Sequence, residues 1–159
     1  MTIRVMEEDF DVSSEIARLR DFRPDVGAVV AFVGTVREMN DGATVSAMTL
    51  EHYPGMTEQT IQVIVQQATA RWSLLGTTVI HRVGTLQPQD QIVLVAVATT
   101  NRSAAFAACE FIMDYLKTSA PFWKKEHTSA GARWVEAHAK DEAALGKWQV
   151  SRTQSHPTL

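Results

Sequence analysis

The sequence predicts an α+β domain, a two-layer sandwich in which helices cover a mostly antiparallel sheet. Two pairs of short apolar runs, rich in β-branched residues, are separated by a segment with helical spacing of its apolar residues. The chain has 159 residues, 45% of them hydrophobic and 21% charged, which is typical of one globular domain. We expect a single domain over residues 1–150. Residues 151–159 are polar and contain proline, so we expect a flexible tail there.

The first half of the chain predicts a helix, two strands and a second helix. Ser13 or Ser14 can cap a short helix. Residues 26–33 and 45–53 are strand-length runs separated by a polar segment with an Asp-Gly turn signal, so they could pair as a hairpin. Apolar residues recur at steps of three and four over residues 57–72, which predicts an amphipathic helix.

The second half predicts further strands and two helices. Ser103 can cap a helix that Pro121 interrupts, because proline has no N–H to donate and clashes with the preceding turn. A last short helix is expected over residues 141–148. The strands are expected at residues 77–83, 92–99 and 133–136.

Charge, cysteine content and hydropathy exclude several classes of protein. The net charge of −3 gives no overall field that would attract nucleic acid. A single cysteine, Cys109, excludes an internal disulfide and a multi-cysteine metal site, and fits a reducing compartment. No apolar run approaches the roughly 20 residues of a membrane helix, and the acidic N-terminus lacks the order of a signal peptide. We therefore expect a cytoplasmic protein that does not span a membrane.

Two lysines at the end of the predicted third helix are candidates for catalysis. Lys117 and Lys124 are seven positions apart and would share one face of an unbroken helix. Pro121 breaks that geometry, so Lys124 is expected just beyond a bend rich in aromatic residues. A lysine in a partly apolar wall has a lowered pKa and can act as a base or nucleophile. The alternative is two solvated lysines that flank a helix end.

Two arginines are candidates for binding an anion. Asn101-Arg102 precedes a helix, where free backbone N–H groups and the guanidinium can bind an anion. Arg37 follows a strand and a glycine, a position from which it could reach the rim of a site. The alternatives are an ordinary capping loop and an ordinary hairpin arginine. These residues indicate an anionic small molecule as the candidate ligand.

The remaining reactive side chains have simpler interpretations. The five histidines lack metal-ligand spacing, so no metal site is expected. His81 alternates on a strand and is expected to be a half-buried, hydrogen-bonded histidine. Cys109 lies on the apolar face of a helix, where it is expected to act as a small hydrophobic residue.

Four blocks of sequence resemble the catalytic subunit family of molybdopterin synthases. The resemblance extends in order from about Val26 to Trp148. The blocks are LEHYPGMTE (Leu50 to Glu58), VIHRVGTL (Val79 to Leu86), FIMDYLKTSAPFWKKE (Phe111 to Glu126) and RWVEA (Arg133 to Ala137).

The resemblance implies a fold, a reaction and a partner. The fold would be of the α/β hammerhead type. The family converts a cyclic pyranopterin monophosphate into the dithiolene of molybdopterin by adding two sulfurs. The sulfur arrives as a thiocarboxylate on the C-terminal Gly-Gly of a small ubiquitin-like partner. Family members form a heterotetramer around a homodimer of large subunits, and this subunit needs no metal or organic cofactor.

The resemblance also implies roles for individual residues. Lys117 matches the essential lysine beside the partner's C-terminus, and Lys124 matches a second catalytic lysine. Arg37 and Arg102 match arginines that hold the phosphate and the pterin. The further members of the implied substrate-binding set are Thr35, Val36, Asn101, Lys125 and Glu126, and all of them except Asn101 could act mainly through their backbone.

Two positions depart from the family pattern and leave alternatives open. Asn101 stands where many members have histidine, and His138 stands where arginine is common. Asparagine can still form hydrogen bonds but cannot carry a proton near neutral pH. One alternative is a non-catalytic paralogue that only binds the small partner. Another is a lysine-dependent lyase that acts on a phosphorylated carbonyl compound.

Overall fold

The four-stranded one of two sheets forms the centre of the molecule. Its strands together contain more residues than those of the other, five-stranded sheet, so it is called the larger sheet. The computed structural model describes residues 1–40, 42–135 and 139–150, so the expected tail at 151–159 lies outside the described residues. The strands of this sheet, in spatial order, are β1 (Thr2–Met6), β5 (Gly76–Arg82), β7 (Gln91–Thr99) and β2 (Ala28–Thr35). The β1–β5 pair is parallel, and the other two pairs are antiparallel.

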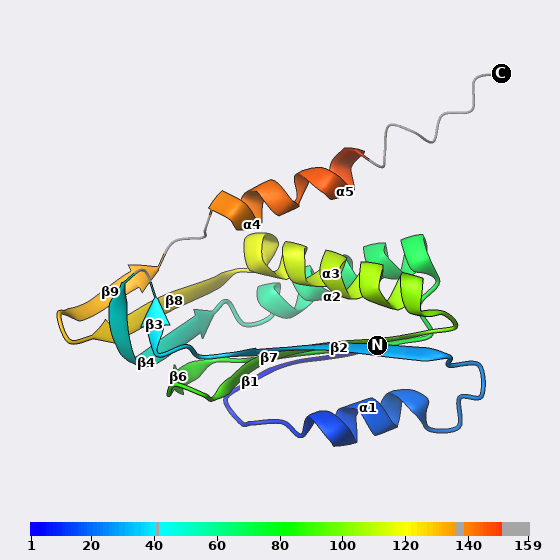
Figure 1. The fold of residues 1–159 in the computed structure, drawn as a ribbon, viewed down its shortest axis with the longest axis horizontal. Coiled ribbons are helices and arrows are strands. Elements are labelled where there is room, and N and C mark those ends of the chain that lie inside the picture. The colour runs from blue at the N-terminus through cyan, green and yellow to red at the C-terminus, as the bar shows by residue number, and fades with distance from the viewer. Residues whose placement is uncertain (41, 136–138, 151–159) are drawn as a thin grey trace.

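Helices cover both faces of the larger sheet. Two long helices, α2 (Met56–Trp72) and α3 (Arg102–Ser119), lie on one face, and the short α1 (Val12–Arg20) lies on the other (Figure 1). The side chains between the sheet and the long helices form the main core, with Phe111 and Ile112 of α3 fully buried. Such burial is the principal stabilising contribution to a domain of this size.

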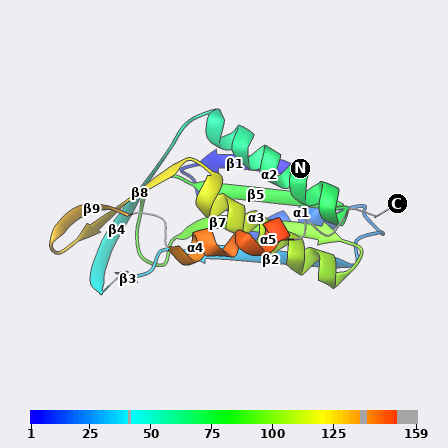
Figure 2. The same cartoon turned by 90° about the horizontal axis from the view of Figure 1, so that it is seen from above.

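The smaller sheet lies at one end of the larger one (Figures 1 and 2). All of its pairs are antiparallel, and β4 is flanked by β3, β8 and β6. Its strands are β3 (Met39–Asn40), β4 (Ala43–His52), β6 (Gly84–Leu86), β8 (Phe122–Thr128) and β9 (Gly131–Val135). Two short helices, α4 (Ala139–Ala144) and α5 (Gly146–Val150), then lead back over α3 (Figure 2).

The predicted fold class is confirmed, and one predicted pairing is wrong. The chain is α+β with mostly antiparallel strands. The runs at residues 26–33 and 45–53 do not form a hairpin, because β2 pairs with β7 while β4 pairs with β6 and β8. The physical reason is burial on both faces of β2: Val30 contacts the core under α2 and α3, and Val33 contacts the core under α1.

Four strands and two caps were not predicted correctly. The missed strands are β1, β3, β6 and β8. Helix α1 is capped by Asp11, whose side chain accepts a hydrogen bond from the N–H of Ser14 at 2.8 Å. Helix α3 is capped by Asn101 rather than Ser103, and its amide oxygen accepts from the N–H of Ala104 at 3.0 Å. The expected helix at 141–148 is two short helices, α4 and α5.

No helix within residues 1–40, 42–135 and 139–150 combines the length and the apolar character needed to cross a bilayer.

Candidate active site

Charged side chains from separate parts of the fold act electrostatically on Lys124, which lies on β8, the strand that follows α3. The charges of Lys117, at the end of α3, and of Arg37, after β2, act on the Lys124 ammonium. Two carboxylates also act on it, those of Glu126 on β8 and Asp141 on α4. Arg37 is also linked to the strand of Lys124 by hydrogen bonds, because it donates to Asn40, which donates to Glu126 on β8. Lys117, Lys124 and Arg37, whose charges act on one another in this part of the fold, are called the cluster.

Strand β8 gives Lys124 its orientation. Pro121 ends α3, as predicted, but the chain continues directly as a strand rather than as a bend. The start of the strand is fixed by Thr57 of α2, whose hydroxyl donates to the carbonyl of Pro121 at 3.1 Å. Because side chains alternate along a strand, Lys124 and Glu126 share one face of β8.

Burial lowers the pKa of Lys124. Desolvation of its ammonium is the largest cause, and the positive charges of Lys117 and Arg37 lower the pKa further. The negative charges of Glu126 and Asp141 oppose this shift. A lysine with a lowered pKa releases its proton more readily, which suits a group that transfers protons during a reaction.

Arg37 is exposed, whereas the residue before it, Val36, is buried and hydrogen-bonded through its backbone. Val36 is 5% exposed and lies in a small apolar cluster with Leu50 and Leu86. Its N–H donates to the carbonyl of Asp90, and its carbonyl accepts from the N–H of Gln89, both at 2.9 Å. Both backbone polar groups of Val36 are therefore hydrogen-bonded within the chain, which fixes the start of the Arg37 segment.

Thr35 lies at the rim, whereas Glu126 is enclosed. Thr35 is an exposed residue at the end of β2, after an irregularity in the pairing with β7. Glu126 is 2% exposed, and its carboxylate accepts hydrogen bonds from the side chains of Asn40 and Arg133. The carboxylate is thus already paired within the protein.

Lys125 lies on the other face of the smaller sheet. Its Nζ is 5.5 Å from the ring centroid of Trp134, the residue opposite it on β9. The alternation along β8 directs it away from Lys124 and Glu126. Within one chain, its side chain does not join the cluster.

Asn101 and Arg102 are also separate from the cluster in one chain. Arg102 begins α3 and Lys117 lies in its last turn. The 15 positions from 102 to 117 correspond to about 22 Å along the axis of an α-helix. Arg102 and Lys117 therefore lie at opposite ends of the same helix.

His81 is a neighbour of the cluster that the sequence did not identify as a site residue. It is 8% exposed, stacks on Phe122 with 3.9 Å between ring centroids, and its Nδ1–H donates to the carbonyl of Arg82 at 2.8 Å. Burial lowers its pKa to about 4, and the charges of His52 and Lys117 act in the same direction. The predicted hydrogen bond is confirmed, but the ring is buried rather than half-buried, and it is neutral at neutral pH.

Asn40 and Arg133 also belong to the surroundings of the site and were missed. Asn40 lies between Arg37 and Glu126, and Arg133 bonds Glu126 from β9. Asn40 lies outside the four blocks that carry the resemblance, and Arg133 begins one of them but was assigned no role, because both roles depend on the pairing of β3 and β9 with the rest of the smaller sheet. His138, the second departure from the family pattern, lies outside the described residues.

Other parts of the molecule offer less chemistry. Cys109 is buried, its thiol contacts the carbonyl of Val95 at 3.6 Å, and burial raises its pKa to about 11, as expected for a structural cysteine. Within the described ranges, no three His, Cys, Asp or Glu residues are grouped so that they could hold a metal.

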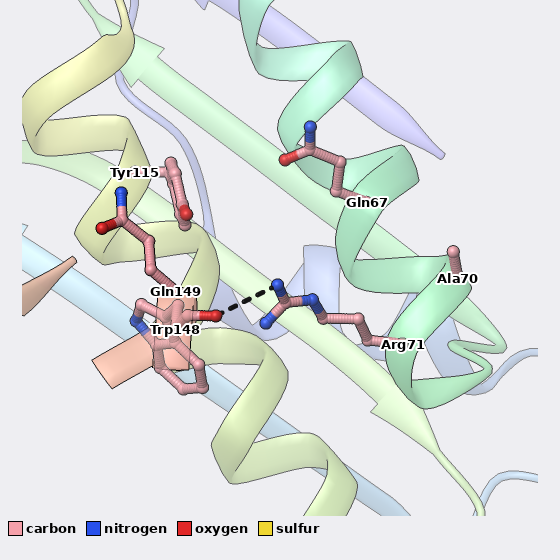
Figure 3. A pocket seen from close by; sticks show the side chains of 6 residues that line it. All are labelled: Gln67, Ala70, Arg71, Tyr115, Trp148 and Gln149. Carbon is pink, nitrogen blue, oxygen red and sulfur yellow. Dashed lines mark hydrogen bonds between the residues drawn. The ribbon is translucent and has the colours of Figure 1, made fainter. Parts of the chain in front are cut away.

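A cavity of about 350 Å³ lies between α2, α3 and α5 (Figure 3). In it, Arg71 donates to the carbonyl of Trp148 at 3.3 Å. None of the predicted site residues contributes to its lining, which consists of Gln67, Ala70, Arg71, Tyr115, Trp148 and Gln149.

The fold and the cluster define a class of protein: an α+β domain in which the charges of two lysines and an arginine act on one another beside a buried, hydrogen-bonded carboxylate. The family described as MoaE protein matches residues 5–119. The chain belongs to this family.

Relatives and solved structures agree with this assignment. The molybdopterin synthase catalytic subunit of Ralstonia nicotianae is 63% identical over 94% of this chain and 85% of its own length. The molybdopterin biosynthesis MoaE protein of Burkholderia ambifaria is 53% identical, with a TM-score of 0.79 over 93% of this chain and 97% of that one. The crystal structure of molybdopterin synthase from Staphylococcus aureus is 31% identical, with a TM-score of 0.75 over 83% of this chain and 95% of that one.

Proposed function

We propose that this chain is the catalytic subunit of a molybdopterin synthase. It transfers sulfur from the C-terminal thiocarboxylate of a small ubiquitin-like partner to cyclic pyranopterin monophosphate, and thereby forms the dithiolene of molybdopterin. The observation that carries this proposal is that the charges of Lys117 and Arg37 both act on Lys124, and that Arg37 is linked through Asn40 to Glu126 on the strand of Lys124. Lys117, Lys124 and Arg37 were assigned to one site from the sequence and come from three parts of the fold. The curated relatives bear the name of this catalytic subunit.

The cationic cluster suits both reactants. The substrate carries a phosphate and the partner's tail carries a thiocarboxylate, so the site must attract two anions within a protein whose net charge is −3. Arg37 binds the phosphate, because a guanidinium can donate two parallel hydrogen bonds to it. Lys117 is exposed at the end of α3 and pairs with the thiocarboxylate.

Lys124 is the group best suited to move a proton. Its pKa is lowered chiefly by burial, so a larger fraction of its side chain is in the neutral amine form at a given pH than for an ordinary lysine. It donates a proton to the phosphate oxygen that is released when the cyclic phosphate opens, and takes up a proton when the site is reset.

A second copy of the chain completes the site. Arg102 lies about 22 Å along α3 from Lys117, so both can bind one substrate only if they come from different protomers. Strand β2 is an edge of the larger sheet. Phe32 on this strand and Phe106 on α3 are 40% and 62% exposed. An edge strand with exposed aromatic residues is suited to association with another chain.

The proposed assembly is a homodimer of this chain within a heterotetramer, in the cytoplasm. The single cysteine favours a reducing compartment. The domain assignment remains one catalytic domain over residues 1–150.

Single-turnover conversion of the cyclic pterin phosphate tests the proposed function. The purified chain is mixed with thiocarboxylated partner and substrate, alongside Lys117→Ala. We expect product from the wild type and none from the variant, because the variant lacks the cation that receives the thiocarboxylate. Lys117 is exposed, so the variant should keep its fold, which circular dichroism and urea unfolding check.

Other outcomes would redirect the assignment. No product from the wild type, with the partner still bound, would indicate the non-catalytic paralogue. Substrate trapped on Lys117 by borohydride in the absence of any partner would indicate the lysine-dependent lyase. Turnover by Lys117→Ala close to that of the wild type would contradict the role of that lysine.

A further inference from the structure

Asn40 is a buried polar residue that connects the exposed Arg37 to the interior of the smaller sheet. It is the second residue of β3 and is 7% exposed. Its Oδ1 accepts a hydrogen bond from Nη2 of Arg37 at 3.2 Å, and its Nδ2 donates to Oε1 of Glu126. One amide therefore bridges a guanidinium and a carboxylate.

The chemistry of the two neighbours permits only one orientation of this amide. The reverse orientation would direct the NH₂ group at the guanidinium, which is donor only, and the carbonyl at the carboxylate, which is acceptor only. Each half of the Asn40 side chain is thus committed to one partner. A buried group fixed at both ends is well suited to transmit the position of Glu126 to Arg37.

The far end of this chain of contacts is anchored in the sheet. Glu126 is 2% exposed, and its Oε2 accepts from Nη2 of Arg133 at 3.2 Å. The same Nη2 donates to the backbone carbonyl of Asn40 at 2.9 Å. Arg133 lies opposite Glu126 in the β8–β9 register. The Arg133 guanidinium therefore neutralises the buried carboxylate of Glu126 and fixes its position. The same guanidinium also fixes the backbone of the two-residue strand β3.

We propose that Asn40 is a positioning residue that holds Arg37 in the orientation in which it binds the substrate's phosphate. This inference rests on the proposed function. Asn40 acts through Arg37 and does not itself contact the substrate. A free arginine loses rotamer freedom when it binds an anion, and a restrained arginine loses less. Arg37 uses one Nη in this contact, so most of its donors remain available.

Steady-state kinetics of Asn40→Ala test this role. We expect the KM for cyclic pyranopterin monophosphate to rise about tenfold, the effect of losing one hydrogen bond to a charged group. We expect kcat to change little, because both lysines are untouched. The matched control is Ser46→Ala, which removes a different side-chain bond of the same sheet, from Ser46 to the carbonyl of His127 at 2.9 Å. The control should leave the KM unchanged.

A double-mutant cycle separates positioning from a general structural effect. If Asn40 acts through Arg37, then Asn40→Ala should not raise the KM further in an Arg37→Ala background. An equal rise of the KM in both backgrounds would overturn the proposal.

Asn40→Asp covers the case in which the alanine variant does not fold. The side chain keeps its shape, but it can no longer donate to Glu126, and its charge neutralises Arg37. We expect the KM to rise here too, and a wild-type KM would overturn the proposal. If the wild type shows no turnover, this inference fails together with the proposed function. If the wild type is active and Asn40→Ala has an unchanged KM, this inference alone is overturned.

Discussion

At the scale of single residues, Lys124 is set apart by its surroundings. It is half-buried on β8, and burial together with the charges of Lys117 and Arg37 lowers its pKa. Chain position alone could not show this, because Lys125, the next residue, lies on the opposite face beside Trp134. The environment of each lysine follows from the alternation of side chains along a strand.

The pH dependence of Lys124 is the first prediction. With the lysines ¹³C-methylated and followed by NMR, the Lys124 signal should titrate at a pH below 10.5, the ordinary lysine value. In Glu126→Gln the midpoint should move further down, because the charge of Glu126 raises the pKa in the wild type. A midpoint at or above the ordinary value, or an upward movement in the variant, would contradict this assignment of causes.

At the scale of elements, helix α3 combines two features. Its first turn is capped by Asn101, and its last turn carries Lys117. Many family members have histidine at the position of Asn101. Asparagine suits this position because it is the N-cap of α3, and asparagine is among the best residues for capping. The amide oxygen that forms the cap is occupied by the N–H of Ala104.

Exchange of Asn101 for histidine is the second prediction. Asn101→His should lower the free energy of unfolding by about 1 kcal/mol, because the cap to Ala104 is lost. Urea unfolding of the described domain measures the change. Asn101→Ser keeps a capping oxygen and serves as the control, with a change of a few tenths of a kcal/mol at most. A histidine variant as stable as the wild type would show that the cap contributes little.

At the scale of the whole molecule, the length of α3 separates the predicted anion-binding residues. Arg37, Lys117 and Lys124 meet in one chain, while Asn101 and Arg102 lie at the far end of the helix. In the proposed homodimer, the two groups serve one substrate across the interface between protomers. The exposed edge strand β2 and the exposed Phe106 give a surface for that interface.

Complementation between inactive variants is the third prediction. Lys117→Ala and Arg102→Ala homodimers should both have greatly reduced turnover. After dissociation and reassociation of an equal mixture, half of the dimers contain one chain of each kind, and each of these has one intact site. Turnover should return to about one quarter of the wild-type value if the site is shared. Mixtures no more active than the separate variants would contradict a shared site.

The sequence by itself determined the fold class, the candidate lysines and the candidate arginines. Apolar periodicity predicted the long helices and the central strands, because the spacing of apolar residues along the chain follows the face of each element that is buried. The segments around Lys117 and Lys124 were specific enough to indicate the family.

Only the tertiary structure decided which strands pair and which site residues meet. The pairing of β2 with β7 depends on helices packing on both faces of the larger sheet, and β3 and β6 are too short to have a period. The roles of Asn40, His81 and Arg133 likewise require contacts between elements far apart in the chain. A sequence pattern reports local burial, whereas a site is made by long-range contacts, and these form only when the sheets assemble.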